Sequence, residues 1–456
     1  MPGLPCYHFA YVFERFPTFT QTFCVREVNE LRRMGLRPLV FSIRDTSDES
    51  LKEHFSPELR EMVHVLPPRN ELVAIVNEWK KQGDLPKKAV LTLRHWGERG
   101  DKNRIYEAIY IGMKMRECGV RHAHSHFAGI GARCGYWLKN LYGLSFSFTG
   151  HANDIFEPTA FPVKLEDLMQ EAAAVVTVSD YTAAWLGERF PRQRRKIRRV
   201  YNGIDMLSFS RERKGREGTD VPLVVSVGRL IEKKGFDDLV KSVARLKEIH
   251  GQPFRVLIVG DGPMREELEQ LIERLGCSDR LQLAGSRNQS EIVEILEEAT
   301  IFALPCVTEK AGGKDNLPTV IMEAMASGLP CVSTRLAGVP EMVVEGNTGL
   351  LTEERDPDAF AHALASLLAD NELCRRMGIA GYGHASKMFA KESTARDLLN
   401  CLVAYGNLRF DPGLAMKFPV ISLCYIAQWF RRLVRWSRGG GKSKFPGIEE
   451  TFKLIS

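Results

Sequence analysis

Residues 301–333 read IFALPCVTEKAGGKDNLPTVIMEAMASGLPCVS and show most clearly the alternation of elements along this chain. An apolar run at 301–304 leads through a polar loop into a segment of helical character, and a second apolar run follows at 330–333. Pro318 suits the first turn of a helix, where its missing N–H costs nothing, and Gly328 followed by Pro330 ends the helix after about ten residues. The stretch therefore predicts a strand, a short helix and another strand.

The start of this helix has the features of an anion site. Asp315 lies in the loop before the helix and Glu323 lies inside it, eight positions later. The N–H groups of Thr319 and Val320 and the positive end of the helix dipole favour phosphate oxygens. A nucleotide sugar would use the amides for its diphosphate and one carboxylate for each sugar. An ordinary amphipathic helix with one solvated Glu would have the same sequence.

Apolar runs alternate with helical periodicity along the chain, which is typical of βαβ units and a parallel sheet. In the first half, the expected strands are residues 7–12, 37–42, 122–125, 145–149 and 174–178, with helices between them such as 22–34. In the second half they are residues 223–227, 255–259, 281–283, 301–304 and 330–333. A chain of 456 residues is too long for one core. We expect an α/β protein of two doubly wound, Rossmann-like domains that face each other across a cleft, with ligands at the carboxyl ends of the strands.

Composition and charge narrow the class of protein. With 44% hydrophobic and 26% charged residues, no low-complexity tract and no short repeat, the chain is typical of a globular protein. The net charge of +6 is modest for this length and does not indicate nucleic acid. Basic residues gather at Lys80, Lys81, Lys87, Lys88 and Arg94, at 192–199 and at 431–444. Tryptophans interleave the first and third clusters, which suits an anionic membrane surface or, equally, a solvated helix face.

The cellular location is predicted from three further features. The ten cysteines are scattered without a CxxC pair, which fits a reducing compartment. The N-terminal sequence MPGLPCYHFAYVF lacks a positive leader and a cleavage site, and reads as the first strand. The longest apolar run, 418–430, has thirteen residues and is too short to span a bilayer. We expect a cytoplasmic protein, either free or peripheral on the inner face of the membrane.

The turns after the strands of the second half carry two cations and several glycines. In GRLIEKKG, Arg229 and Lys234 follow the strand at 223–227 and would stabilise a departing diphosphate. Because no convincing DxD pattern is present, we predict that these side chains act without a metal or other cofactor. Gly260 in VGDGP allows close backbone approach. Gly285 and Arg287 follow the next strand, where backbone groups could hold a nucleobase. Tight-turn chemistry explains these glycines equally well.

Polar residues also follow strands in the first half. His151, in SFTGHANDIF, comes directly after a strand and a glycine at the expected cleft edge. The alternating imidazoles of HAHSHF, which end at His126, suggest a metal, but no acidic or Cys ligand follows at a suitable spacing. After the first strand, FPTFTQTFCVR places hydroxyl, amide and helix N-terminal groups within reach of a ligand, at Thr20, Gln21 and Thr22.

Taken in order, these motifs resemble the retaining glycosyltransferases of the large GT-B family 4 over nearly the whole chain. The matching elements are FPTFTQTF, HSHFAG, FTGHANDIF, VVTVSDY, YNGID, VGRLIEKKGFDDL, IVGDGP, DNLPTVIMEAMASGLP and AGVPEMVVEGNTGLL. The first of these together with GHANDIF is similar to enzymes that build exopolysaccharide or colanic-acid-type surface glycans.

The resemblance implies roles for individual residues. Arg229 and Lys234 would bind the diphosphate, Glu323 the ribose, Asp315 the donor sugar, and His151 the donor sugar near its reacting carbon. The wider donor-binding set is Gly228, Gly260, Gly285, Arg287, Asn316, Leu317, Pro318, Thr319, Val320 and Glu323, and the acceptor or phosphate side is Thr20, Gln21, Thr22 and His126. The family usually has Glu where Asp315 stands and glycine where Asn316 stands, which leaves the identity of the donor sugar open.

The same resemblance implies a domain plan and a reaction. We expect an acceptor-binding domain at 1–208, a nucleotide-sugar-binding domain at 209–385, a returning helix at 386–410 and a basic tail at 411–456. The mostly helical segment 71–117 is interpreted as an insertion for substrate or membrane contact. The reaction would move a hexose, with retention, from a nucleotide sugar to a glycan acceptor that is lipid-linked. Two alternatives remain: an epimerase or phosphorylase-like enzyme of the same fold, or a non-catalytic nucleotide-sugar binding protein.

Overall fold

Two parallel sheets form the framework of the computed structural model, which describes residues 7–18, 21–46, 55–96, 101–157, 160–209, 221–406 and 408. The first sheet contains, in spatial order, β3 (Val63–Val65), β2 (Pro38–Ser42), β1 (Phe9–Phe13), β4 (His122–His126), β5 (Ser145–Gly150), β6 (Ala174–Thr177) and β7 (Ile197–Arg199). The second contains β10 (Leu281–Gly285), β9 (Arg255–Val259), β8 (Leu223–Val227), β11 (Ile301–Leu304), β12 (Cys331–Thr334) and β13 (Gly349–Thr352). Neighbouring strands pair in parallel throughout both sheets. The prediction of two doubly wound, Rossmann-like domains is confirmed.

Both sheets follow the same strand order. In each sheet the direction in which successive strands are added reverses once, between β1 and β4 in the first sheet and between β8 and β11 in the second. In open α/β sheets the loops that follow such neighbouring strands diverge and leave room for a ligand. The fold therefore predicts that ligand-binding residues follow these four strands.

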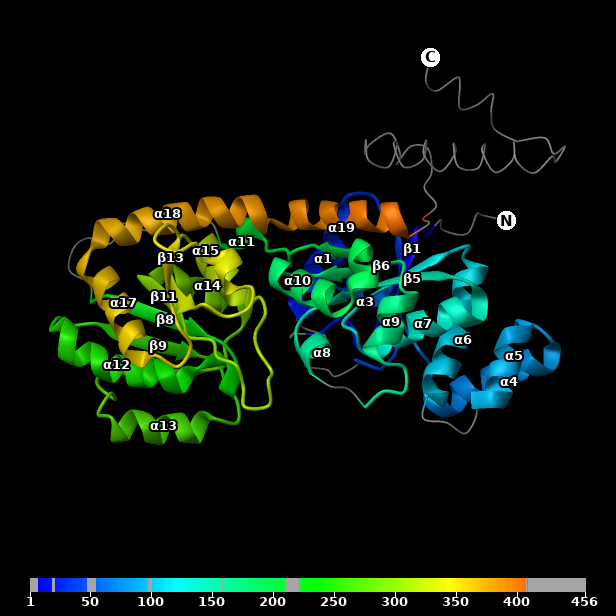
Figure 1. Cartoon of the computed structure of the whole chain (residues 1–456), viewed down its shortest axis with the longest axis horizontal. Coiled ribbons are helices and arrows are strands. Elements are labelled where there is room, and N and C mark those ends of the chain that lie inside the picture. The colour runs from blue at the N-terminus through cyan, green and yellow to red at the C-terminus, as the bar shows by residue number, and fades with distance from the viewer. Residues whose placement is uncertain are drawn as a thin grey trace, which may run out of the picture. The chain divides into compact units, whose positions relative to one another are not determined.

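Helices cover the sheets. In the first half they are α1 (Thr22–Arg33), α3 (Pro57–Glu61), α4 (Arg69–Gln82), α5 (Lys87–Trp96), α6 (Lys102–Glu117), α7 (Ile130–Tyr142), α8 (Asn153–Phe156), α9 (Leu165–Glu171), α10 (Asp180–Arg189), the 3-10 helix η2 (Pro191–Lys196) and α11 (Met206–Phe209). In the second half they are η3 (Glu232–Lys234), α12 (Phe236–His250), α13 (Arg265–Arg274), α14 (Gln289–Glu298), α15 (Thr319–Ala326), α16 (Val339–Met342), α17 (Pro357–Ala369), α18 (Asn371–Met388) and α19 (Lys391–Tyr405). Figure 1 shows α12 and α13 on one side of the second sheet and α14 and α15 on the other.

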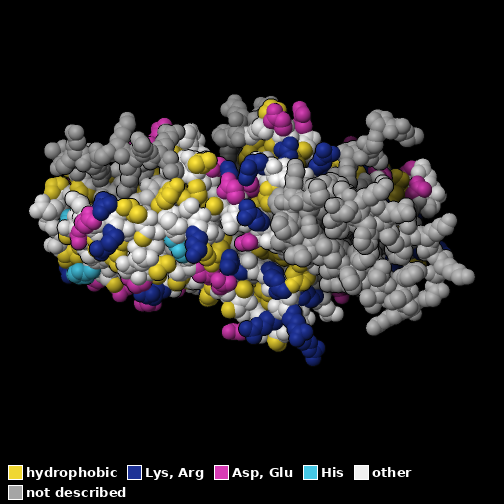
Figure 2. Space-filling view, turned by 90° about the horizontal axis from the view of Figure 1, so that it is seen from above, with side chains coloured by type: hydrophobic (Ala, Val, Ile, Leu, Met, Phe, Trp, Pro, Cys, Tyr) yellow, Lys and Arg dark blue, Asp and Glu magenta, His cyan; other side chains and the backbone are white. Residues whose placement is uncertain are grey.

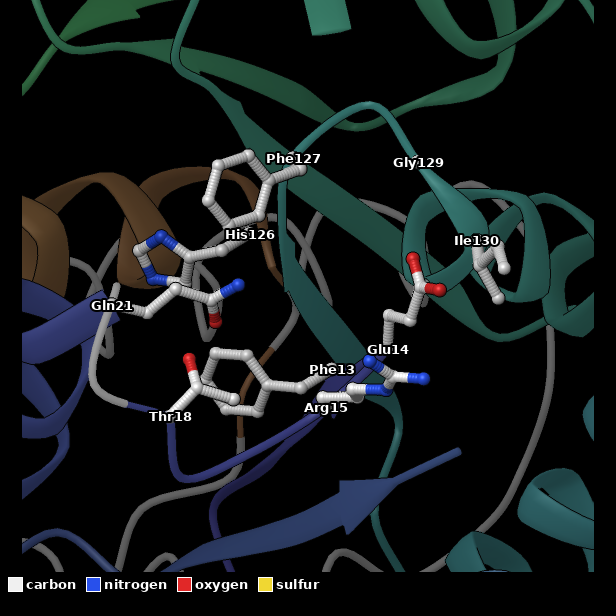
Figure 3. Close-up of a pocket in the computed structure, with 10 residues that line it drawn as sticks. Phe13, Glu14, Arg15, Thr18, Gln21, His126, Phe127, Gly129 and Ile130 are labelled. Carbon is white, nitrogen blue, oxygen red and sulfur yellow. The ribbon is translucent and has the colours of Figure 1, made fainter. Parts of the chain in front are cut away.

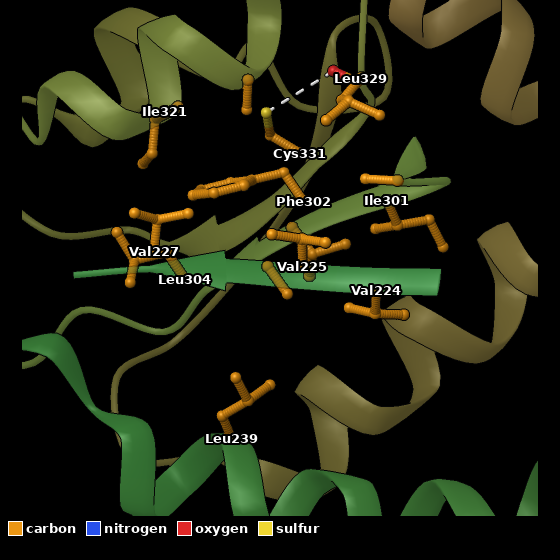
Figure 4. Close-up of a cluster of buried hydrophobic side chains, with 14 of the residues drawn as sticks. Val224, Val225, Val227, Leu239, Ile301, Phe302, Leu304, Ile321, Leu329 and Cys331 are labelled. Atoms are coloured by element: carbon orange, nitrogen blue, oxygen red, sulfur yellow. Dashed lines mark hydrogen bonds between the residues drawn. The ribbon is translucent and has the colours of Figure 1, made fainter. Parts of the chain in front are cut away.

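The core of the second sheet follows from its sequence. All five residues of β8, LVVSV, are buried, as the central strand of a sheet covered on both faces requires. Figure 4 shows the side chains of β8 and β11 between Leu239 of α12 and Ile321 of α15. Burial of one such apolar side chain contributes about 1.5–3 kcal/mol, so this layer fixes where the loops after β8 and β11 emerge.

The chain crosses between the two sheets twice at one place. The isolated bridge between Ile204 and Ala390 joins the outgoing and returning segments. The N–H of Ile204 donates to the carbonyl of Phe389, and the N–H of Lys391 donates to the carbonyl of Ile204. Lys391 also pairs with Asp205 at 2.5 Å. After this crossing, α19 packs against α1 and β6 of the first sheet.

Three strands of the described residues were not predicted from the sequence: β3, β7 and β13. Each has only three or four residues and lies at the edge of its sheet or next to it. Edge strands are often short and charged, as in IRR of β7, and they lack the continuous apolar run of a central strand. The predicted strands match observed ones with shifts of one or two residues at their ends. The predicted segment 71–117 is covered by α4, which begins two residues earlier at Arg69, and by α5 and α6, so its helical character is also confirmed.

Several predictions concern residues that the structure does not describe. Thr20, the charged stretch 211–219, the apolar run 418–430 and the basic tail 411–456 lie outside the described residues. The domain boundaries and the roles assigned to each segment stay predictions. Within the described ranges, none of the helices combines the length and apolar character that a membrane span requires. On the face that Figure 2 shows, the described Lys and Arg side chains are interspersed with Asp and Glu.

The imidazoles of the HAHSHF motif lie inside the first sheet. His122 contacts the hydroxyls of Ser145 and Ser147 at 2.8 Å each. His124 contacts the hydroxyl of Ser147 at 2.7 Å and that of Thr149 at 3.0 Å. These bonds link β4 to β5 by side chains as well as by backbone. Among the described residues, no group of three or more His, Cys, Asp and Glu side chains is arranged to hold a metal ion.

Because His122 and His124 are buried, we expect the protein to lose stability in mild acid. Burial lowers the pKa of His122 to about 3, and burial and the neighbouring histidines hold the pKa of His124 well below its usual range. The unfolded chain therefore binds protons below about pH 6.5 that the folded protein does not. Each histidine should remove up to about 1.4 kcal/mol of unfolding free energy per pH unit below that point.

Urea denaturation between about pH 7.5 and about pH 5.5 measures this slope. Replacing His122 with glutamine should reduce it, whereas the same change at the exposed His362 should leave it unaltered. A flat profile in the wild-type protein would show that the buried imidazoles accept protons while folded.

Candidate functional site

A cavity of about 510 Å³ lies beyond the carboxyl ends of β1 and β4. Its lining includes three residues from the predicted segments, Thr18, Gln21 and His126. Figure 3 shows Gln21, His126 and Phe127 on one side of the cavity and Glu14, Arg15 and Ile130 on the other. The Thr18 hydroxyl is buried and has no hydrogen-bond partner in the described part of the chain. An unsatisfied buried hydroxyl is a group that a polar ligand could engage.

A chain of hydrogen bonds runs from this cavity to His151. Nε2 of His151 lies 3.0 Å from Nδ1 of His126, and Nε2 of His126 lies 2.8 Å from Oε1 of Glu27. Glu27 also accepts a hydrogen bond from the hydroxyl of Tyr11. The structure thus brings His126 and His151 into direct contact. Glu27 and Tyr11 were missed, because only the folded chain brings α1 and β1 to the end of β4.

Packing and burial hold His151 in one orientation. Its ring lies against Phe127 and Phe23, with centroids 4.4 Å and 4.8 Å away. Its backbone N–H donates to the Asp154 carboxylate at 3.1 Å. Burial and the neighbouring His126 hold the pKa of His151 well below its usual range, so the ring is neutral at pH 7. A neutral imidazole can exchange hydrogen bonds with sugar hydroxyls but does not supply a positive charge.

The loop after β8 carries the predicted cations. Lys234 belongs to η3, and its Nζ lies 2.5 Å from Oδ2 of Asp315, with both side chains mostly buried. Burial raises the pKa of Asp315, but Lys234 outweighs it and the net pKa falls below the usual range. Burial lowers the pKa of Lys234, but Asp315 outweighs it and the net pKa rises. Both groups are therefore ionised at pH 7. Arg229, on the same loop, is exposed.

Glycines allow this loop to form. Gly235 has φ of +65°, and a Cβ there would lie 1.9 Å from the carbonyl oxygen of Pro305. A Cβ on Gly260 would lie equally close to the carbonyl oxygen of Gly228. The N–H of Gly260 donates to the carbonyl of Gly285 at 2.9 Å. The predicted glycines Gly228 and Gly260 thus follow β8 and β9, Gly285 ends the adjacent β10, and Gly260 contacts both of the others. Arg287 lies on the exposed surface beyond them, 3.7 Å from Glu291.

The short helix α15 starts beside these loops. It spans eight residues, Thr319–Ala326, and Gly328 follows it with φ of +70°. Pro318 is its N-cap, one position before the predicted first turn, and no side chain caps the helix. The N–H groups of Thr319 and Val320 therefore have no acceptor within the helix. This arrangement leaves the donors that a diphosphate requires.

Glu323 of α15 faces the first half of the chain. Its Oε1 accepts a hydrogen bond from Nη2 of Arg26 of α1 at 3.0 Å. Burial raises the pKa of Glu323 and Arg26 opposes that rise. Nη1 of Arg26 is buried without a hydrogen-bond partner among the described residues. Arg26 lies within the FPTFTQTFCVR segment, but the sequence gives no sign that it meets a carboxylate almost three hundred residues away.

Asn316 ties the two halves together. Its Nδ2 donates to the carbonyl of His151 at 2.8 Å, and its Oδ1 accepts from the hydroxyl of Ser179 at 2.7 Å. The Asn316 amide therefore bonds within the protein at both ends. The adjacent Leu317 and Pro318 are also buried, and Thr22 opens α1. Of the predicted donor residues, Asp315, Thr319, Val320 and Glu323 lie around the start of α15, together with Lys234.

Known proteins match both halves of the chain. Residues 20–206 match the family described as Glycosyltransferase Family 4, and residues 209–384 match Glycosyl transferases group 1. The D-inositol 3-phosphate glycosyltransferase of Corynebacterium efficiens is 32% identical over 320 residues, which cover 64% of this chain and 73% of that protein. The putative colanic acid biosynthesis glycosyltransferase WcaL of Escherichia coli is 35% identical over 202 residues, or 44% of this chain and 49% of that protein. The chain thus spans about half the length of the colanic acid relatives.

Solved structures share the fold. A glycosyltransferase from Rickettsia africae has a TM-score of 0.66 at 16% sequence identity, covering 87% of this chain and 97% of that chain. Anabaena Alr3699/HepE in complex with UDP has a TM-score of 0.66 at 18% identity, covering 87% and 99%. The family matches, the relatives and the two parallel sheets agree: this chain belongs to the GT-B glycosyltransferases of family 4.

Proposed function

We propose that this protein transfers a sugar from a nucleotide sugar to a hydroxyl of a glycan acceptor during surface or exopolysaccharide biosynthesis. One observation carries the proposal: Lys234 pairs with Asp315 in the loop before the uncapped start of α15, Glu323 lies within that helix, and Asn316 joins the same loop to His151. The relatives named for colanic acid and lipopolysaccharide core biosynthesis support the class of product. Anabaena Alr3699/HepE, solved with UDP and glucose, supports a nucleotide-sugar donor.

The residues around α15 would each bind a different part of the nucleotide sugar. The N–H groups of Thr319 and Val320, with Lys234 and Arg229, would bind the diphosphate and offset the charge that develops as it leaves. Glu323 would accept hydrogen bonds from the ribose hydroxyls. Asp315 would accept those of the donor sugar. Because these groups are held in place before the donor arrives, little reorganisation is needed during the reaction.

We propose transfer with retention, without a resident metal. The acceptor hydroxyl would attack the anomeric carbon on the face from which the diphosphate leaves, and a diphosphate oxygen would take the hydroxyl proton. The neutral His151 would hold the donor sugar by a hydrogen bond near that carbon. The Asp154 carboxylate beside His151 accepts hydrogen bonds from the backbone N–H groups of Ala128, His151 and Ala152, so it is a poor candidate for the nucleophile of a covalent sugar–enzyme intermediate.

The acceptor would enter from the first half, through the cavity lined by Thr18, Gln21 and His126. We propose that the acceptor is lipid-linked and that the protein acts in the cytoplasm, at the inner face of the membrane. The basic residues of α4 and α5 would favour an anionic surface. Trp79 of α4 contributes less than the sequence suggests, because its ring stacks on Tyr110 with centroids 5.7 Å apart.

Thermal-shift measurements with UDP-, GDP- and ADP-sugars test the donor. One nucleotide class should stabilise the protein, by about 2.7 kcal/mol when it is present at a hundred times its Kd. Release of free nucleotide that depends on an added acceptor would then establish transfer, and the anomeric configuration of the product, read by NMR, would establish retention. An epimerase would instead alter the sugar while leaving it attached to the nucleotide. A binding protein would leave the donor unchanged.

A further inference from the structure

A second cavity, of about 710 Å³, lies beyond the carboxyl ends of β2 and β3. Its walls come from the loops after β1, β2 and β3, from the start of α4 and from the first turns of α6. The helices α4 and α6 form most of the segment 71–117, which the sequence analysis interprets as an insertion. The cavity therefore combines a strand-end position with the part of the first half that differs from a minimal doubly wound domain.

Arginine dominates the charge of this cavity. Arg15, Arg44, Arg69 and Arg104 line it, against the carboxylates of Asp45 and Glu107. Arg44 pairs with Glu14 at 3.2 Å, but both side chains are about half exposed, so that pair contributes little. Burial raises the pKa of Glu107 to about 7, so its negative charge is incomplete at neutral pH. The balance of charge in the cavity is positive.

Arg104 gives the strongest sign of a missing ligand. Only 8% of the residue is exposed, and its Nη2 donates to Oε1 of Glu107 at 2.7 Å. Its Nη1 is buried and has no hydrogen-bond partner among the described residues. Oδ2 of the nearby acid Asp101 accepts a hydrogen bond from Nε1 of Trp137 at 2.6 Å, and its Oδ1 is buried without a hydrogen-bond partner among the described residues. A buried guanidinium N–H left without an acceptor costs about 1–3 kcal/mol, which an anion in the cavity would recover.

Two helices point their positive ends at the same space. Arg69 is the first residue of α4, and Arg104 lies in the first turn of α6. Neither helix has a side-chain cap. The N–H groups of both first turns, which no side chain of the described residues caps, add to the guanidinium groups, and both favour phosphate oxygens.

Arg15 connects the two cavities, because it lines both. We propose that the arginine-lined cavity binds a phosphate or diphosphate group of the acceptor, while the sugar hydroxyl to be glycosylated lies in the cavity beside His126. This inference rests on the proposed function, since it assigns a chemical class to the acceptor of that reaction. A lipid diphosphate and a soluble sugar phosphate carry the same anion, so the experiment must distinguish the two.

Calorimetric titration with inorganic pyrophosphate tests the anion site. The titration uses the full chain carrying Arg229→Ala, which weakens the proposed donor diphosphate site without disturbing the buried Lys234–Asp315 pair. Adding Arg44→Ala and Arg69→Ala, both at exposed side chains, should weaken pyrophosphate binding at least about 10-fold. Arg104→Lys should also weaken binding, because it keeps the charge but removes the forked donor. The matched control is Arg37→Ala, an exposed arginine outside both cavities.

Pyrophosphate binding that is absent, or that is equally strong with and without Arg44 and Arg69, would overturn the proposal. Farnesyl diphosphate and farnesol then identify the source. Tighter binding of farnesyl diphosphate than of pyrophosphate supports a lipid-borne anion, and equal binding supports a soluble one. Binding of farnesol as tight as that of its diphosphate would again overturn the anion site. Nucleotide-sugar binding is measured separately, so a failed donor assignment cannot be mistaken for a failed acceptor site.

Discussion

Replacing Lys234 with alanine is expected to lower kcat by about 10²–10³-fold, the scale for losing one preorganised group that stabilises developing charge. Lys234 is ionised, mostly buried and fixed 2.5 Å from Asp315, so in the proposed complex its ammonium group would already be in place when the diphosphate arrives. Steady-state release of nucleotide, measured with donor and acceptor both saturating, gives the change directly. If turnover of this variant equals that of the wild type, Lys234 has no part in the chemistry.

The same substitution should also destabilise the protein. It leaves the Asp315 carboxylate buried without its partner, at a cost of about 3–5 kcal/mol. The double variant Lys234→Ala with Asp315→Asn removes both charges and should recover much of the unfolding free energy while turnover remains low. The control is Arg375→Ala on α18, where an exposed arginine pairs with the exposed Glu372 at 2.6 Å. It should alter neither turnover nor stability by much.

Replacing Glu323 with glutamine is expected to raise the KM for the nucleotide sugar by about 10–100-fold, with a smaller effect on kcat. A hydrogen bond to a charged acceptor contributes about 1.5–3 kcal/mol, and each 1.4 kcal/mol is tenfold in affinity. The ribose lies far from the reacting carbon, so its contacts serve the ground state and the transition state alike. Initial rates over a range of donor concentrations measure KM and kcat separately.

Glu323 also pairs with Arg26, so a loosened contact between the two halves could mimic lost ribose binding. Glu341→Gln supplies the matched control. Its carboxylate joins the two halves through Tyr201 and the N–H groups of Asp180 and Tyr181. If Glu341→Gln raised the donor KM as much as Glu323→Gln, the effect would come from the contact between the halves. An unchanged KM in Glu323→Gln would remove that residue from the ribose site.

The fold could be predicted because its central strands are encoded locally. Runs such as LVVSV at 223–227 are apolar throughout, and the turns between them carry glycine at fixed places. The edge strands were missed since they have only three or four residues each and gain their strand conformation from a neighbour. The helix α15 was predicted with nearly correct ends because Pro318 and Gly328 act within the chain itself.

The candidate site could be predicted only in part. Residues with a local signature, such as His151 and Lys234, were found from the motif around them. Glu27, Tyr11 and Arg26 were missed, because their importance arises from partners on other elements. The Lys234–Asp315 pair joins two loops that were each predicted, but their contact depends on β8 and β11 being neighbours. The cavity around Arg104 is lined by four separate segments, and no motif in the sequence predicts that they meet.

The hydrogen-bonded crossing at Ile204 and Phe389 makes the second sheet a candidate for independent folding. Because the chain leaves and returns at one point, residues 206–388 form an excursion whose two ends are adjacent in space. Such a piece is suited to production as an isolated fragment, and the flanking ends could be rejoined by a short peptide without stretching either one. The second half of the chain could therefore be exchanged between relatives as a single cassette, with the first half left intact.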